Sequence, residues 1–144
     1  MDKARIAVLV SGGGTNLQAL LDAQMKGILK SGQICLVISN NPNAYALERA
    51  KNAGVEGKVI TKKEAGSQSV FEQKIIDLLE EKQIDIIVLA GFMSILSENF
   101  TGRYPERILN VHPSLIPSFC GAGFYGLRVH EEALRYGVKV TGAT

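Results

Sequence analysis

The sequence predicts an α/β fold of the Rossmann-like type, in which a mostly parallel sheet carries helices on both faces. Two observations support this prediction. Short apolar runs alternate along the chain with segments whose apolar residues recur at helical spacing. The first two runs end in turn-forming stretches, residues 11–14 and 39–43, as buried parallel strands commonly do. In folds of this kind, ligands bind along the edge of the sheet where the strands end.

The apolar pattern also predicts the order of the elements. Strands are expected at residues 6–10, 35–38, 59–60, 84–89 and 108–111, and residues 138–144 alternate as a half-buried strand would. Helices are expected over residues 17–28, 46–53, 71–79 and 131–136. Either Ser67 or Ser69 is the expected N-cap of the third helix, while Gly54 and Gly137 end the second and the fourth.

Composition and charge exclude several classes of protein. The 144 residues are 46% hydrophobic and 21% charged, so we expect a single domain over residues 1–144 with a buried core. The net charge is only +2 and no basic cluster occurs, so no nucleic-acid partner is expected. No run approaches the roughly 18 apolar residues of a membrane span. Cys35 and Cys120 lie far apart, which favours free thiols and a cytoplasmic location.

A glycine-rich loop at residues 11–16 is the first candidate binding site. Glycines let a ligand approach the backbone, and the helix that follows offers free N–H groups and the positive end of its dipole, which favour a phosphate. Thr15 or Asn16 could cap this helix or donate to phosphate oxygens. Gly12 and Gly14 match half of a dinucleotide fingerprint, but Leu17 occupies the third glycine position, so a monophosphate fits better. A simple tight turn is the alternative.

An amide and an imidazole form the second candidate site. Asn110 and His112 are two residues apart on the predicted strand and would face the same side, with Pro113 ending the strand. The amide can stabilise an oxyanion and the histidine can move a proton, which together suit acyl transfer. The alternative is a structural role, in which Asn110 and His112 form hydrogen bonds with the carbonyl groups of nearby loops. His130 is expected at the surface or as a helix cap, and no metal site is expected because the histidines lack ligand spacing.

Three segments in order carry a resemblance to a known family. Residues 11–21, 89–97 and 108–119 read SGGGTNLQALL, LAGFMSILS and ILNVHPSLIPSF. Together they closely resemble glycinamide ribonucleotide formyltransferase (phosphoribosylglycinamide formyltransferase), a folate-dependent enzyme of purine biosynthesis. The resemblance extends over essentially the whole chain. The NxHPSLxP segment alone is less specific, because other folate formyl enzymes share it.

The resemblance implies a reaction and a set of site residues. The amine of glycinamide ribonucleotide would take the formyl group of 10-formyltetrahydrofolate, giving formylglycinamide ribonucleotide and tetrahydrofolate. Gly14, Thr15 and Asn16 would hold the substrate phosphate, and Asn110 and His112 would be catalytic. The folate pocket would be lined by Met93, Ser94, Ile95 and Leu96. His112 would act as an imidazolium, which the family supports with an aspartate in an Asp-Gly-Gly turn.

The sequence departs from the family pattern in three places. The supporting aspartate would lie just beyond Thr144, a residue that matches a position supporting that aspartate, so we expect a domain truncated at its C-terminal end with little or no activity. Gln68 stands where some members place an arginine near the folate tail. Residues 121–126 form a glycine-rich turn that looks longer than usual.

Three other classes of protein share parts of this sequence pattern. Formyltetrahydrofolate hydrolase shares the Asn-x-His segment, but it usually has an additional N-terminal domain and this chain opens directly on its first strand. Methionyl-tRNA formyltransferase would need a basic surface that the chain lacks. A non-catalytic, Rossmann-type nucleotide-binding module would explain the glycine loop, but it would leave Asn110, His112 and the 89–97 segment unexplained. The sequence leaves homodimer assembly open.

Overall fold

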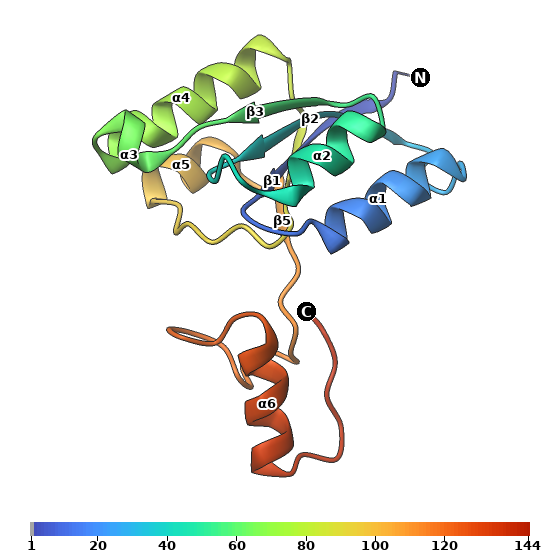
Figure 1. The fold of residues 1–144 in the computed structure, drawn as a ribbon, viewed down its shortest axis with the longest axis vertical. Helices are drawn as coiled ribbons and strands as arrows, with labels where there is room; N and C mark the ends of the chain where they lie inside the picture. The colour runs from blue at the N-terminus through green and yellow to red at the C-terminus, as the bar shows by residue number, and fades with distance from the viewer. Residues whose placement is uncertain (1) are drawn as a thin grey trace. The chain divides into compact units, whose positions relative to one another are not determined.

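The computed structural model describes residues 2–144, which divide into two compact units (Figure 1). The first, the sheet unit, extends to Leu109, and the second, the C-terminal unit, comprises Asn110–Thr144. The expectation of a single domain over residues 1–144 stays a prediction.

Five strands form one sheet in the order β3-β2-β1-β4-β5. Their bounds are β1 (Ala4–Val10), β2 (Gly32–Ser39), β3 (Glu56–Val59), β4 (Ile86–Leu89) and β5 (Ile108–Asn110). The pairs β1–β2, β1–β4 and β2–β3 are all parallel. β1 therefore lies at the centre of the sheet, and a helical segment follows each strand and leads to the next one, as the alternating sequence pattern predicts.

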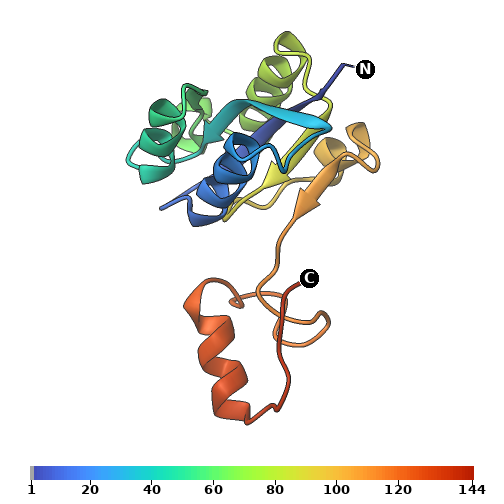
Figure 2. The same ribbon diagram turned by 90° about the vertical axis from the view of Figure 1, so that its right-hand side faces the viewer.

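Helices cover both faces of this sheet (Figure 2). On one face, α1 (Thr15–Met25) and α2 (Tyr45–Asn52) contribute to a core cluster; on the other, α4 (Gln68–Glu81) and α5 (Glu98–Arg103) contribute to a second cluster. The remaining helices are the short α3 (Lys62–Ala65) and, in the C-terminal unit, α6 (Leu127–Tyr136). The Rossmann-like fold class is confirmed.

The central strand contributes to both clusters because its side chains alternate between the two faces. Ile6, Val8 and Val10 pack in the cluster with α1 and α2, whereas Ala7 and Leu9 pack in the cluster with α4 and α5. Apart from Ile6, which is 8% exposed, these side chains have no exposed surface. A strand buried on both faces reads as a continuous apolar run, which is how this segment appears in the sequence.

An extra residue interrupts the register between β1 and β2. Ile6 pairs with Ile34, but Ala7 pairs with Leu36, so Cys35 has no partner of its own. Cys35 and Leu36 consequently both pack with the cluster that contains α4, although they are neighbours in sequence. This is the signature of a β-bulge, and it moves the rest of β2 back into phase with β1.

Several predicted element bounds are wrong. The first helix ends at Met25, because Gly27 adopts a φ of +70° that turns the chain away, and Met25 and Ile28 are exposed. The last helix begins at Leu127, four residues earlier than predicted, so His130 lies within it and is exposed. The predicted strand at 138–144 is absent from the structure. The alternation there reflects an extended loop.

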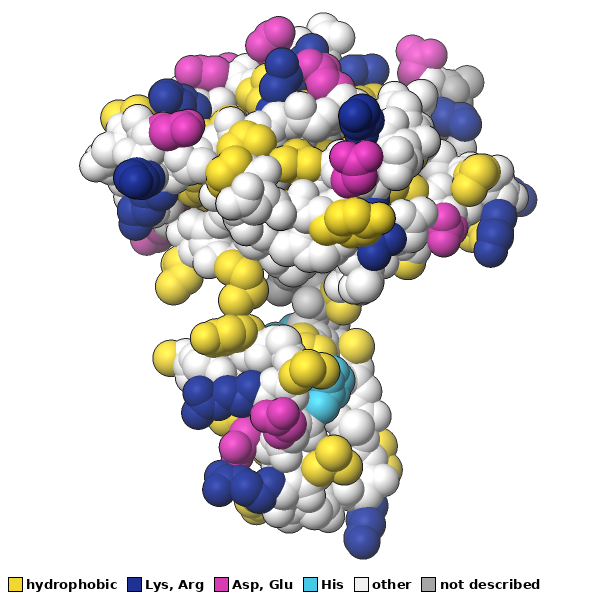
Figure 3. All heavy atoms as spheres, viewed as in Figure 1, with side chains coloured by type: hydrophobic (Ala, Val, Ile, Leu, Met, Phe, Trp, Pro, Cys, Tyr) yellow, Lys and Arg dark blue, Asp and Glu magenta, His cyan; other side chains and the backbone are white. Residues whose placement is uncertain are grey.

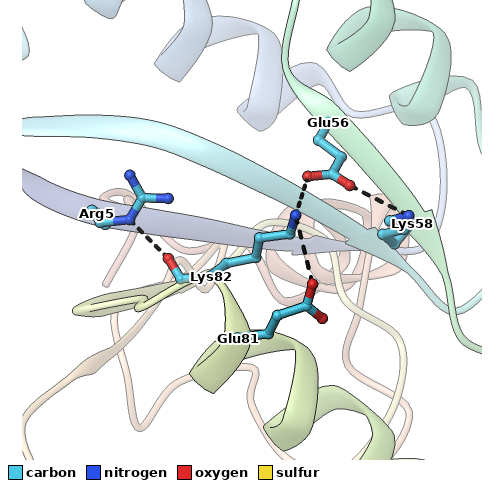
Figure 4. Close-up of polar contacts among 5 residues, drawn as sticks. All are labelled: Arg5, Glu56, Lys58, Glu81 and Lys82. Carbon is cyan, nitrogen blue, oxygen red and sulfur yellow. Dashed lines mark hydrogen bonds and ion pairs between the residues drawn. The ribbon is translucent and has the colours of Figure 1, made fainter.

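The N-terminal ends of β1 and β3 are joined to the end of α4 by a charged cluster (Figure 4). Lys82 Nζ lies 2.9 Å from Glu56 Oε2, and Lys58 Nζ lies 3.3 Å from Glu56 Oε1. Hydrogen bonding to Lys82 and Lys58 lowers the pKa of Glu56, and bonding to Glu56 raises the pKa of Lys82. Arg5 Nε donates to the carbonyl of Lys82 at 2.8 Å. These strand ends are opposite to those that carry the glycine loop, so we assign the cluster a structural role.

The C-terminal unit is small and depends on aromatic contacts. The ring of Phe119 lies 6.2 Å from that of Phe124 and 6.1 Å from that of Tyr136. In α6, Val129 and Ala133 are buried, while Leu134 and other apolar side chains face outward. Figure 3 shows hydrophobic side chains at the surface of this unit. Within residues 2–144, no helix combines the length and apolar character that crossing a membrane requires.

Candidate functional site

The glycine loop connects β1 to α1, and its carbonyl groups are held by the neighbouring segments. Three successive carbonyl oxygens accept hydrogen bonds: Ser11 O from Asn41 Nδ2 at 3.2 Å, Gly12 O from Ala46 N at 3.0 Å, and Gly13 O from Arg49 Nε at 2.7 Å. All three donors come from α2 or the turn before it. The loop is therefore fixed through its carbonyls, and this leaves the N–H groups at the start of α1 for a ligand.

Arg49 holds the loop to both flanking helices. Its Nη1 atom donates to Gln18 Oε1 at 3.2 Å, in addition to the bond from Nε to Gly13 O. The guanidinium also lies 4.9 Å from the centre of the Tyr45 ring, at the distance of a cation–π contact. One side chain thus links α1, α2 and the loop, and it adds a positive charge beside the start of α1.

Gly14 is the N-cap of α1, with a φ of +75° and no side-chain capping bond. Its carbonyl accepts from Gln18 N at 2.8 Å, so the amides of Thr15, Asn16 and Leu17 have no partner within the helix. The expectation that Thr15 or Asn16 caps the helix is wrong, since both are helical residues. Both are exposed, and their role as phosphate donors stays a prediction.

We expect Gly14→Ala to destabilise the protein by about 2–4 kcal/mol, because it combines left-handed strain with overpacking. A Cβ atom at Gly14 would lie 2.7 Å from Ala46 Cβ and 2.9 Å from Ala46 Cα. Gly13→Ala is the matched control, since a Cβ there meets nothing within 4 Å. Urea unfolding measures both variants, and equal losses of unfolding free energy would contradict this account.

The predicted folate segment lies in the loop between β4 and α5, next to the glycine loop. The hydroxyl oxygen of Ser11 accepts a hydrogen bond from Met93 N at 2.8 Å. Met93 and Ile95 are 58% and 90% exposed, whereas Leu96 packs against the core cluster beneath. Because β1 and β4 are parallel neighbours, both predicted binding segments leave the same edge of the sheet. The structure therefore places the glycine loop and the predicted folate segment next to each other in the sheet unit.

Glu72 is a buried carboxylate that the sequence motifs did not indicate. It is only 5% exposed, and its Oε1 atom accepts from Ser97 N at 2.6 Å and from Gln68 Nε2 at 2.9 Å, while Oε2 accepts from Ser97 Oγ at 2.5 Å. Its spacing to Ile76 and Leu79 puts it on the buried stripe of α4. A charged residue in phase with an apolar stripe is the signal that could have identified it.

Hydrogen bonding to Glu72 has a consequence for stability in acid. Burial alone raises the pKa of this carboxyl, but the bonds from Ser97 and Gln68 outweigh burial, so the pKa lies below its ordinary value of 4.5. The folded state therefore binds this proton less readily than the unfolded state. The stabilisation is fully present above pH 4.5 and is lost as the pH falls through the lower folded pKa.

We expect Glu72→Gln to remove this acid-sensitive part of the stability. Near neutral pH the variant should lose about 1.5–3 kcal/mol, the range for hydrogen bonds to a charged group. As the pH falls below the lowered folded pKa of Glu72, the unfolding free energy of the variant should approach that of the wild type, since both side chains are then neutral. Urea unfolding over a pH series checks this, and a difference that does not change with pH would refute it.

The two predicted catalytic residues belong to the C-terminal unit. Asn110 is the last residue of β5 and is exposed, while His112 lies two residues beyond the strand and is half-buried. The expectation that both side chains lie on one strand is therefore wrong. The strand ends before the histidine, three residues earlier than the proline that was expected to stop it.

Thr144 lies beside His112. The amide of His112 donates to the Thr144 carbonyl at 2.7 Å, and the amide of Thr144 donates back to the His112 carbonyl at 2.9 Å. The Thr144 hydroxyl donates to Ser114 O at 2.7 Å and accepts from Ile116 N at 3.0 Å. These four bonds fix the path of the chain on both sides of Pro113, while the role of Thr144 in supporting the family's aspartate stays a prediction.

The imidazole of His112 is oriented by a single backbone carbonyl. Nε2 lies 3.0 Å from Phe119 O. Since a carbonyl oxygen only accepts hydrogen bonds, this contact requires a proton on Nε2. Nδ1 is therefore the ring atom that remains for proton exchange or for a further hydrogen bond.

Other features of the described residues lie outside the predicted site. A cavity of about 820 Å³ between α4 and α5 is lined by Gln68, Glu72 and Ser97 among others, but by none of the predicted phosphate-binding or folate-binding residues. Among residues 2–144, no group of three or more His, Cys, Asp or Glu side chains is arranged to hold a metal ion.

The family follows from comparison with known proteins. The family model described as formyl transferase matches residues 4–144. The chain belongs to the formyl transferase family. Among curated members of this family, it is 41% identical over 140 residues to the phosphoribosylglycinamide formyltransferase of Haemophilus influenzae, covering 97% of this chain and 63% of that protein. It is 46% identical over 142 residues to the human trifunctional purine biosynthetic protein adenosine-3, covering 99% of this chain and 14% of that protein.

Solved structures of formyl transferases confirm the fold. Glycinamide ribonucleotide transformylase 1 from Symbiobacterium toebii superposes with a TM-score of 0.88 at 40% identity, covering 99% of this chain and 64% of that one. The corresponding protein from Geobacillus kaustophilus gives a TM-score of 0.90 at 36% identity, covering 99% of this chain and 73% of that one. The 144-residue chain thus spans about two thirds, or less, of the length of the curated relatives it matches.

Proposed function

We propose that the protein transfers the formyl group of 10-formyltetrahydrofolate to the amine of glycinamide ribonucleotide, a step of purine biosynthesis. The observation that carries this proposal is the contact between the two binding segments of the sheet unit, Met93 N to Ser11 Oγ at 2.8 Å. It supports a phosphate site and a folate site side by side at one sheet edge. Membership of the formyl transferase family, with relatives named for this substrate, agrees with it.

The ribonucleotide phosphate would bind at the start of α1. The amides of Thr15 and Asn16 have no helical partner, and their side chains are exposed beside them. The helix dipole favours a negative charge at this point, and Arg49 adds a full positive charge nearby. Gly14, with its positive φ, lets the loop turn into the helix without a side chain that would obstruct the phosphate.

The folate would bind along the segment from Met93 to Leu96. Met93 and Ile95 expose apolar surface that a flat aromatic ring system could cover, while the backbone groups of the segment could pair with polar ring atoms. These residue types therefore fit 10-formyltetrahydrofolate as the co-substrate, which would supply the activated formyl group.

The chemistry would be carried by Asn110 and His112. As the substrate amine forms a bond to the formyl carbon, the carbonyl oxygen becomes an oxyanion, and the Asn110 amide would donate to it. The amine nitrogen loses a proton, the bond from the formyl carbon to the folate nitrogen breaks, and that nitrogen gains a proton. His112 would stabilise the oxyanion as an imidazolium and relay this proton.

Substrate binding tests the proposal. Glycinamide ribonucleotide should raise the melting temperature of the full-length protein in a concentration-dependent manner, because a ligand that binds only the folded state stabilises it. Inorganic phosphate at the same concentration is the control for simple anion binding. No shift with the ribonucleotide, or an equal shift with phosphate, would contradict the proposal.

We also propose that residues 1–144 on their own have little or no turnover, since the aspartate that the family pairs with the catalytic histidine is not among them. The formyl-transfer rate of this segment should fall at least about 100-fold below that of the full-length protein, the scale for loss of assisted proton transfer. Comparable rates would overturn this expectation. The cytoplasmic location and a homodimer stay predictions.

A further inference from the structure

We propose that Glu72, acting with Gln68, is a positioning residue that holds the folate-binding segment in its binding conformation. The proposal rests on the proposed function, because it assigns a role to the segment from Met93 to Leu96 as the folate site. It goes beyond that function in assigning a positioning role to Glu72, which belongs to none of the three family motifs, and to Gln68, whose position the family resemblance places near the folate tail.

The segment between β4 and α5 is irregular, so its shape must come from contacts with other parts of the sheet unit. Three of its backbone groups are bound by side chains from distant elements. Met93 N donates to Ser11 Oγ at 2.8 Å, Ile95 O accepts from Gln68 Nε2 at 3.1 Å, and Ser97 N donates to Glu72 Oε1 at 2.6 Å. The segment is thus anchored at its start, middle and end, and two of the three anchors come from α4.

Glu72 is the centre of this arrangement because it holds the other groups in place. Its carboxylate accepts from the Gln68 side chain at 2.9 Å, so the same Nε2 group bridges Glu72 and the carbonyl of Ile95. It also accepts from the hydroxyl of Ser97, whose oxygen in turn caps α5 through Phe100 N. One buried carboxylate therefore fixes the middle of the segment, its end and the start of the helix that follows.

The burial of Glu72 is a further argument that this residue has a specific role. A buried carboxylate costs free energy unless it is fully hydrogen-bonded, and an apolar side chain at this place in the stripe of α4 would avoid that cost. Glu72 is 5% exposed and is the only buried acidic side chain among residues 2–144. Its three donors all serve the folate segment or hold a residue that binds it, which links the buried charge to that segment.

The test compares substrate constants in the full-length protein. In Glu72→Gln, KM for 10-formyltetrahydrofolate should rise about 10-fold or more, while KM for glycinamide ribonucleotide should stay within about twofold. Gln68→Ala removes the link to Ile95 and one donor to Glu72 but keeps the buried carboxylate and its bonds from Ser97, so a smaller rise of about threefold in the folate KM is expected. Glu81→Gln is the matched control, an exposed glutamate at the other end of α4 whose loss should change neither constant.

A second readout reports on the segment itself. Hydrogen exchange at the Ser97 amide should accelerate in Glu72→Gln relative to the core strands, because its acceptor is weakened. If Glu72→Gln does not fold, Gln68→Ala alone decides. An unchanged folate KM in the variants that fold would overturn the inference, and so would an equal rise in both substrate constants, which indicates general destabilisation. A wild-type protein that binds neither substrate would instead refute the proposed function.

Discussion

Replacing His112 with alanine in the full-length protein is expected to lower kcat about 10²–10⁴-fold, the range for loss of a general acid–base group. His112 is half-buried, and its Nε2 atom is already committed to the Phe119 carbonyl. The imidazole therefore has a defined orientation and one free nitrogen, as a proton-transfer group requires. KM for the ribonucleotide should change little, since the phosphate would bind in the sheet unit.

His130→Ala is the matched control for this variant, because the other histidine of the chain is exposed on α6. Its rate should equal that of the wild type. Steady-state kinetics of both variants provide the comparison. A His112→Ala enzyme with wild-type kcat would contradict the assignment of His112 as the proton-transfer group.

Replacing Asn110 with alanine should reduce kcat about 10²–10³-fold, the range measured when one oxyanion donor is removed. Asn110 is the last residue of β5 and its side chain is exposed, so the loss should affect catalysis more than stability. An effect confined to the transition state lowers kcat and kcat/KM equally. Both constants from initial rates, together with a melting temperature within a few degrees of the wild type, would establish that pattern.

Asn52→Ala, at the exposed end of α2, is a suitable control for asparagine removal. It should leave both constants unchanged. If Asn110→Ala instead raised KM with kcat unaltered, the amide would contribute to ground-state binding, and its assignment as an oxyanion donor would be wrong.

The fold was predictable where local and global signals agree. The segment from Ile6 to Val10 is continuously apolar because both faces of β1 are covered, and the glycines after it mark the turn into α1. The serine cap of α4 followed in the same way, since Ser67 accepts from Val70 N as an N-cap residue should. In these places composition, spacing and turn chemistry point to one structure.

Sequence patterns do not predict the structure where a tertiary contact decides the outcome. Glu72 carries a charge but is buried, because Ser97, at the start of α5, supplies two hydrogen bonds to it and Gln68 on its own helix supplies a third. The end of the chain alternates in sequence, yet only Thr144 pairs with another segment, through the backbone of His112. Alternation indicates which face a residue could occupy, but it does not supply the neighbouring strand that makes a sheet.

The candidate site shows the same division. The phosphate loop and the folate segment were identified as motifs, and the bond from Met93 N to Ser11 Oγ shows that they are neighbours. The support behind the loop was not predictable. Arg49 reads in sequence as an ordinary helix-surface residue, and only the fold brings its Nε atom to the carbonyl of Gly13.

The most direct test of the account is a formyl-transfer assay with the full-length protein, in which release of tetrahydrofolate from 10-formyltetrahydrofolate is followed with and without glycinamide ribonucleotide. The account predicts release that depends on the ribonucleotide and that is matched, mole for mole, by formylated product. Release at the same rate without the ribonucleotide would indicate a hydrolase, and no release under either condition would indicate a binding module; either result would contradict the account.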